Sequence, residues 1–183
     1  MSASPFYDVN GLEKVAINLF YGWGYNFYRQ ENQLRADDQL IRSKVGVLLG
    51  SARKSVEGAE RDYRREFLPP PSREKPRPDA GAVANAQAIE RLSKAIGALQ
   101  GLITAQPVPE NDRMTQRYRE EAGTLQQLVA SDQKLAGQVE LLRSLLDGKN
   151  GAWLIQNMSD LEDGISAISA TLKARQMLLF PAA

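Results

Sequence analysis

The stretch that decides the fold reads Leu125-Gln-Gln-Leu128-Val-Ala-Ser-Asp132-Gln-Lys-Leu135-Ala-Gly-Gln-Val139-Glu-Leu-Leu142-Arg-Ser-Leu-Leu146. The numbered positions follow one another at alternating steps of three and four residues. Side chains with this spacing share one face of an α-helix. All of them are apolar except Asp132, so the stretch predicts an amphipathic helix with one carboxylate on its apolar face.

Apolar stripes of this kind predict helical segments at residues 10–67, 82–105, 110–147 and 152–180. At about 1.5 Å per residue, the first segment is longer than its neighbours can cover. We expect a break or a kink at residues 22–24, because Gly22 and Gly24 lie there and glycine weakens a helix interior by about 1 kcal/mol. The pattern leaves open whether residues 10–67 form one helix or two.

Residues 68–81 carry five of the nine prolines in the chain, which predicts an extended linker. At about 3.1 Å per residue, this linker could span about 40 Å and return the chain along a bundle. A recognition motif for a proline-binding domain is the alternative interpretation. The connections at residues 107–109 and 148–151 are short, so the helices that they join should be antiparallel neighbours. We therefore predict one all-α domain over residues 1–183, an antiparallel up-and-down helical bundle of about four helices with a Pro-rich crossover.

The composition excludes several classes of chemistry. The 183 residues contain no cysteine and no histidine, which excludes disulfides, Cys/His zinc sites, thiol catalysis and every triad with an imidazole base. With 23 Lys and Arg against 22 Asp and Glu, the net charge is +1, so no overall field would gather nucleic acid. The basic residues at 53–77 are interleaved with acidic ones, which is typical of a solvated face.

The chain also shows no pattern for membrane insertion or secretion. No run of 18 apolar residues is present, so we expect no membrane span. The N-terminus has no basic region followed by an apolar one, so a cytoplasmic location is the expectation.

Charged residues interrupt the apolar stripes at a few positions, namely Glu31, Asp38, Glu121, Asp132 and Arg175. A buried unpaired charge is strongly unfavourable, so each should be paired, or lie near a bundle end or a kink. Counting residues away from the turn after Leu146 places Arg175 within about one turn of Glu121, which predicts an Arg175–Glu121 ion pair. The alternative is a metal site with oxygen ligands only, but carboxylate dimetal bundles usually also use histidine. We therefore predict no metal and no cofactor.

The aromatic segment at residues 18–38 is the most unusual part of the chain. Six aromatic side chains fall between residues 20 and 28, and charged and amide side chains follow directly. Tyrosine and tryptophan combine an apolar ring with a polar group, which suits interfaces and ligand pockets. A bundle end capped by aromatics beside a solvated face is the alternative interpretation. If a site exists here, we expect it to use Tyr21, Trp23, Tyr25, Tyr28, Arg29, Glu31, Asn32, Arg35 and Asp38.

These patterns favour a non-enzymatic helical interaction or assembly protein. It would act through the aromatic segment, by forming a homodimer or by binding another protein, and we predict no catalytic residues. The alternative is a ligand-binding or metal-binding helical bundle, with or without catalytic activity, that uses the stripe carboxylates and the Tyr/Arg cluster.

Overall fold

The computed structural model describes residues 4–25, 27, 34–73, 76–106 and 122–179. The elements in chain order are the 3-10 helix η1 (Pro5–Tyr7) and the α-helices α1 (Val9–Trp23), α2 (Leu34–Phe67), α3 (Ala80–Ala105), α5 (Ala122–Leu146), α6 (Gly151–Gln156) and α7 (Met158–Leu179). The predicted all-α helical bundle is confirmed, and the described residues form no strand. These residues contain six α-helices where about four were expected, because the first and the last predicted helices are each divided.

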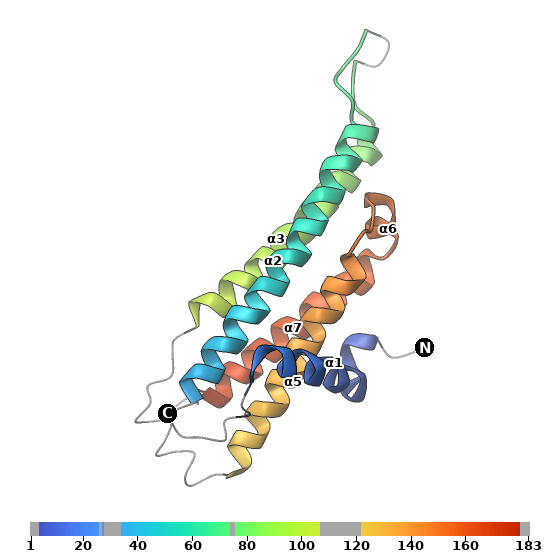
Figure 1. Ribbon diagram of the computed structural model, residues 1–183. Coiled ribbons are helices and arrows are strands. Elements are labelled where there is room, and N and C mark those ends of the chain that lie inside the picture. Colours follow the sequence, from blue (N-terminus) through green and yellow to red (C-terminus); the bar gives the residue numbers. More distant parts are fainter. Residues whose placement is uncertain (1–3, 26, 28–33, 74–75, 107–121, 180–183) are drawn as a thin grey trace.

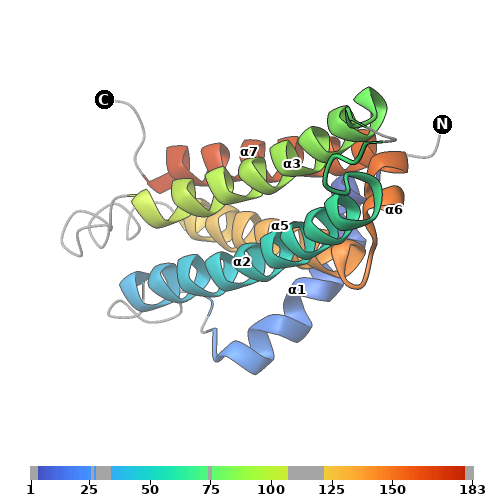
Figure 2. The same cartoon turned by 90° about the horizontal axis from the view of Figure 1, so that it is seen from above.

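Four long helices, α2, α3, α5 and α7, lie side by side and form the bundle (Figures 1 and 2). Helix α2 packs on α3 and α5, and α7 packs on α5 and α3. The stripe that decides the fold lies inside, since Leu128, Leu135 and Leu142 are fully buried. Helix α1 runs across α5 on the outside of the bundle, and η1 contacts both α1 and α7 (Figure 1).

The long first segment is divided at the expected glycines. Helix α1 ends at Trp23, and Gly24 adopts a left-handed conformation with φ of 73°. Its N–H donates to the carbonyl of Phe20 and so satisfies one of the last carbonyls of the helix. Only glycine adopts this conformation readily, so the chain leaves the helix at Gly24, and the described residues form two helices within 10–67.

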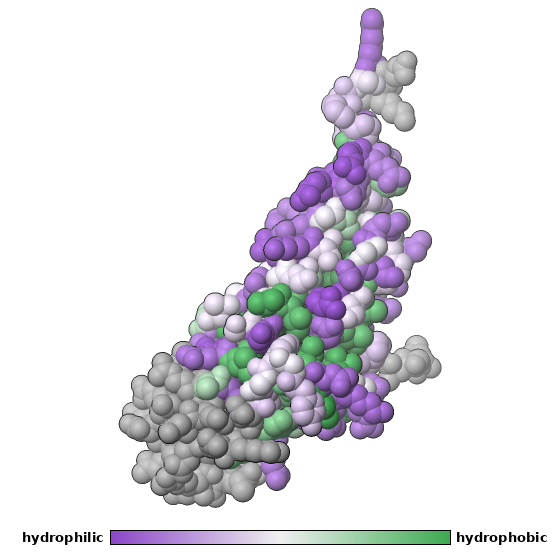
Figure 3. Space-filling model, in the orientation of Figure 1, coloured by the Kyte–Doolittle hydropathy of each residue, from purple (hydrophilic) through white to green (hydrophobic). Residues whose placement is uncertain are grey.

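The Pro-rich linker joins neighbouring ends of α2 and α3 and does not run along the bundle. The two helices are held together close to the linker by hydrogen bonds from Asn85 to the Tyr63 hydroxyl (3.1 Å) and from Arg64 to Glu90 (3.0 Å). The α2–α3 pair extends past the other helices, and the linker lies at its tip (Figure 1). On the face shown in Figure 3, hydrophilic residues cover most of this projecting part.

The predicted fourth helix is also divided. Asn150 caps α6 by accepting a hydrogen bond from the Trp153 N–H at 3.0 Å, and α6 ends before Asn157. Helix α7 then begins at Met158. This interruption changes the register between α5 and α7, which matters for the position of Arg175.

The N-terminal segment is fixed tightly to the bundle. The buried amide of Gln138 on α5 donates to the Phe6 carbonyl at 3.0 Å. The Phe6 ring lies directly over Gly164 of α7, where a Cβ atom would overlap it. The backbone of Leu12 approaches Gly137 of α5 just as closely. Small residues on α5 and α7 therefore let η1 and α1 pack directly on the backbones of the bundle.

Candidate functional site

The most distinctive feature inside the molecule is a buried group of charged side chains. Asp132 of α5 lies at its centre and is fully buried. The Tyr25 hydroxyl donates to Oδ2 of Asp132 at 2.9 Å, and Nε of Arg175 on α7 donates to Oδ1 at 2.5 Å. These contacts join the segment after α1 to two helices of the bundle.

Arg175 extends the group to α2. Its Nη2 atom lies 2.9 Å from Oδ1 of Asp38, and Nη2 of Arg42 lies 2.7 Å from Oδ2 of the same carboxylate. Nη1 of Arg42 donates to the Gln106 carbonyl at the end of α3, at 2.7 Å. We call Tyr25, Asp38, Arg42, Asp132 and Arg175 the charge network.

The charge network is balanced and almost dry. Asp38, Asp132 and Arg175 are at most 1% exposed, and the Arg42 side chain is 10% exposed. Two guanidinium groups face two carboxylates, which offsets the loss of hydration on burial. The contacts of Asp38 are ion pairs by distance, but neither has hydrogen-bond geometry among the described residues. Asp38 is therefore held by charge rather than by aligned hydrogen bonds.

The charge network lies at one end of the bundle, which we call the network end. Helix α2 begins there, and α3 and α7 end there, as the contacts of Arg42 with Gln106 and of Arg175 with Asp38 require. Figure 1 shows these three helix termini together at the lower left. Tyr25 brings the C-terminal end of α1 toward the same place. With α5, which carries Asp132, five helices thus meet around one set of buried charges.

An aromatic cluster covers Tyr25. The Phe20 ring lies 4.2 Å from the Tyr25 ring between centroids, and the Phe27 ring lies 4.9 Å from it in an edge-to-face arrangement. Trp23 is half-buried, with its ring 6.0 Å from Phe20. These rings exclude water from the Tyr25–Asp132 hydrogen bond, which strengthens its electrostatic part.

The ion pairs within the charge network limit its capacity for metal binding and for acid–base catalysis. Arg175 lies between the carboxylates of Asp38 and Asp132, so a guanidinium already occupies the position that a bridging cation would take. The part of the chain that the structure describes contains no group of three or more side chains suited to holding a metal ion. A general acid or base also needs access to substrate, which these buried atoms lack. The arrangement fixes α1, α2, α3, α5 and α7 relative to one another.

The candidate residues from the aromatic segment are distributed between the interior and the surface. Tyr25 and Asp38 are buried in the charge network, Trp23 is half-buried, and Tyr21 is 83% exposed. The structure therefore brings Tyr25 and Asp38 together but directs Tyr21 away from them. The remaining candidates lie outside the described residues or have side chains outside them, namely Tyr28, Arg29, Glu31, Asn32 and Arg35.

The predicted Arg175–Glu121 ion pair stays a prediction, because Glu121 lies outside the described residues. Arg175 was expected beside Leu125 and instead contacts Asp132, seven residues closer to the end of α5. The division between α6 and α7 accounts for this shift, since the count had assumed one continuous helix after Leu146.

Sequence reasoning identified Asp38, Asp132 and Arg175 as charges on apolar stripes but did not bring them together. Arg42, which lies four residues after Asp38 on the same helix, belongs to this group as well. Sequence reasoning also did not identify Gln138, which is fully buried on α5. A polar residue within an otherwise apolar stretch was the available signal for Gln138.

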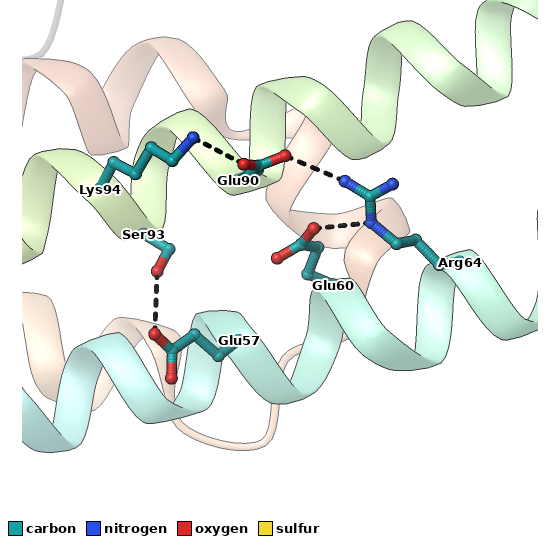
Figure 4. Close-up of polar contacts among 6 residues, drawn as sticks. All are labelled: Glu57, Glu60, Arg64, Glu90, Ser93 and Lys94. Atoms are coloured by element: carbon teal, nitrogen blue, oxygen red, sulfur yellow. Dashed lines mark hydrogen bonds and ion pairs between the residues drawn. The ribbon is translucent and has the colours of Figure 1, made fainter.

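A second set of ion pairs holds the projecting α2–α3 pair together on its surface. Figure 4 shows Arg64 of α2 between Glu60 on the same helix and Glu90 of α3. Arg64 lies 2.7 Å from Glu60 and 3.0 Å from Glu90, and Lys94 lies 2.6 Å from Glu90. The hydrogen bond from Lys94 is the main reason why the pKa of Glu90 lies below its ordinary value. These pairs are partly exposed, so each contributes little to stability and mainly sets the register of the two helices.

Comparison of the chain with protein families, with curated proteins and with solved structures found no match. In the parts of the chain that are described, no helix is both long enough and apolar enough to span a membrane.

Proposed function

We propose that this chain is a non-enzymatic interaction protein whose network end binds a second copy of the chain or another protein. The observation that carries the proposal is the exposure of Tyr21. At 83%, it is the most exposed large hydrophobic side chain among the described residues, and it lies one turn before the buried Tyr25. A tyrosine ring in this position offers a large contact area at low cost in conformational entropy.

Two other exposed apolar side chains belong to the same end of the bundle. Leu102 is 52% exposed and lies one turn before Gln106, whose carbonyl binds Arg42. Met177 is 71% exposed and lies two residues after Arg175. Tyrosine and methionine are enriched in protein interfaces, and these two side chains, with Leu102, support a contact surface at this end of the bundle.

The buried charges support a role in rigidity and not in catalysis. Asp38 and Asp132 are engaged by Arg42, Arg175 and Tyr25, so their pairing holds the helix ends in one arrangement. A rigid surface loses little conformational freedom on binding, which favours affinity. The alternative of a ligand-binding or metal-binding core has less support, because these carboxylates already have their counter-charges.

Exposed residues at the network end can be changed without disturbing the core, so the proposal can be tested directly. We expect the wild-type chain to form an oligomer in light scattering after size exclusion, or to retain a partner in an affinity capture. Tyr21→Ser and Met177→Ser should abolish the association, whereas Tyr7→Ser should not. Tyr7 is the matched control, since it is 53% exposed and lies in η1 before α1. The proposal would be refuted if the wild-type chain is monomeric and if every protein that it captures is also captured by Tyr21→Ser.

A further inference from the structure

The connection between α2 and α3 is longer than the fold requires. Helix α2 ends at Phe67 and α3 begins at Ala80, so residues 68–79, twelve in all, join two helices that already pack on each other. Helix–helix connections in bundles usually take about 2–8 residues. Packed helices lie about 8–10 Å apart, whereas twelve extended residues reach about 37 Å. The additional length projects at the tip of the α2–α3 pair (Figure 1).

Three consecutive prolines lie on the α2 side of this tip. Pro69, Pro70 and Pro71 are all exposed and belong to no helix. Each ring fixes its own φ at about −65° and restricts the preceding residue to extended backbone. Leu68, Pro69 and Pro70 each precede a proline, so the local covalent structure alone favours one turn of polyproline II here. Such a turn has three residues, and its rings therefore face in three directions.

The start of the proline segment is anchored to the bundle. The Leu68 N–H donates to the Arg64 carbonyl at 2.9 Å, and the half-buried Leu68 side chain packs against the core. One turn earlier, the Tyr63 ring lies 4.5 Å from the Phe67 ring between centroids, and the Tyr63 hydroxyl accepts a hydrogen bond from Asn85 of α3. A segment that is ordered before binding loses little conformational freedom when a partner takes it up.

The chemistry of the exposed prolines selects the kind of surface that fits them. Proline has no N–H, and among the described residues Pro69, Pro70 and Pro71 make no hydrogen bond. Their carbonyls are therefore open to a donor from outside. Aromatic-lined grooves bind polyproline II segments by packing on the rings, and tyrosine and tryptophan can also donate to backbone carbonyls.

An exposed cation follows the prolines. Arg73 lies two residues after Pro71, is exposed, and has no ion pair with another described residue. In the sequence, Glu74 and Lys75 come next and carry opposite charges, so together they do not change the net charge. A carboxylate beside the aromatic groove would pair with Arg73 and would fix the register of the segment.

We propose that the tip of the α2–α3 pair binds an aromatic-lined groove on a partner protein, one that accepts consecutive prolines and carries a carboxylate to meet Arg73. Grooves that require two prolines three residues apart do not fit, because the linker has its prolines at positions 69, 70, 71, 76 and 78. The tip is distinct from the network end, and its binding does not depend on association there. The alternative is a plain connection, in which the prolines stabilise the chain by restricting its unfolded state but bind nothing.

The probe is a panel of isolated WW and EVH1 domains, whose aromatic grooves bind proline-rich segments. SH3 domains that require two prolines three residues apart serve as the negative comparison. We expect at least one WW or EVH1 domain to bind the full chain in a fluorescence titration. Excess poly-L-proline should displace the chain, since it occupies the same groove as a polyproline II helix.

Matched variants locate the binding on the chain. Pro69→Ala, Pro70→Ala and Pro71→Ala together should weaken binding about tenfold or more, because the rings and the fixed backbone are both lost. The control is Pro76→Ala with Pro78→Ala, which removes exposed prolines from the same tip but leaves the three consecutive ones intact.

The charge is tested in the same titration. Arg73→Glu should weaken binding more than Arg77→Glu, which makes the same charge change four residues further along the exposed tip. Circular dichroism should show all variants to be folded, since every changed side chain is exposed.

The outcomes separate the tip from the network end. If no domain in the panel binds the wild type more tightly than the triple alanine variant, or if poly-L-proline does not compete, the tip is not a proline ligand. A triple variant that only lowers the melting temperature would establish the plain connection. Loss of self-association in the triple variant would show that the prolines bind a second copy, which also overturns the proposal. Tyr21→Ser should leave domain binding unchanged, so failure at the network end appears in a different variant.

Discussion

Replacing Arg175 with methionine tests whether the charge network holds the bundle together. The substitution keeps a long side chain but removes the guanidinium that contacts both Asp132 and Asp38. Both carboxylates are at most 1% exposed, so they cannot recover the lost contact from water. The variant therefore keeps the packing and removes the counter-charge.

The size of the effect follows from the contacts that remain. Removing one partner of a buried ion pair generally costs about 3–5 kcal/mol. In the variant, Asp132 keeps the hydrogen bond from Tyr25 and Asp38 keeps its contact with Arg42, so we expect the lower part of that range, about 3 kcal/mol. Such a loss is a large share of the roughly 5–15 kcal/mol by which a domain of this kind is stable.

The assay is urea unfolding followed by circular dichroism at the helix band. Arg143→Met is the matched control, because Arg143 pairs with Glu140 on the surface of α5 and both side chains are partly exposed. An ion pair of this kind contributes about 0.2–1 kcal/mol. A double-mutant cycle of Arg175→Met with Asp132→Asn should give a coupling energy of about 0.5–3 kcal/mol.

Two results would refute the reasoning. One is a loss of unfolding free energy in Arg175→Met that is no larger than the loss in Arg143→Met. The other is a coupling energy near zero between Arg175 and Asp132, which would mean that the buried contact adds nothing to what each side chain contributes alone.

Two further predictions concern the N-terminal segment and the surface of α5. Gly164→Ala would drive a methyl group into the Phe6 ring, so the free energy of unfolding should fall by about 1–3 kcal/mol and the melting temperature should fall with it. Gly101→Ala places its methyl group in open space on a helix and should raise the melting temperature. Equal shifts in the two variants would contradict the packing of Phe6 on Gly164. The hydrogen bond from Arg143 is the main reason why the pKa of Glu140 is lowered. The pair therefore stabilises the fold at pH values above the ordinary glutamate pKa, and this stabilisation is lost as the pH falls through the lowered pKa. A side-chain NMR titration of Arg143→Met should show the pKa of Glu140 rising, and an unchanged value would contradict the assignment.

The sequence predicted the parts of this structure that depend on local periodicity. The alternating spacing around Leu128 and Leu142 indicated a buried helical face, and both residues are fully buried. Gly22 and Gly24 indicated the break in the first segment, because the conformational preference of glycine is a property of the residue itself. The positions of Asp132 and Arg175 on apolar stripes also marked them as charges in need of partners.

The identity of those partners required the tertiary structure. Tyr25 and Asp132 are 107 residues apart, and Asp132 and Arg175 are 43 residues apart. Their contact depends on how α1 crosses α5 and on the register of α7 after its separation from α6. A shift of two turns along a helix changes the partner of a side chain while leaving the apolar spacing unaltered.

Local spacing alone thus determined that this chain forms amphipathic helices, that the first of them breaks near Gly22 and Gly24, and that Asp38, Asp132 and Arg175 lie on inner faces. Each of these follows from residues close together in sequence. Only the tertiary structure decided that the Pro-rich segment joins two adjacent helices at a projecting tip, that Arg175 serves two carboxylates at once, and that Tyr21 faces solvent while Tyr25 does not. These outcomes depend on the crossing and register of whole helices, which many weak contacts set together.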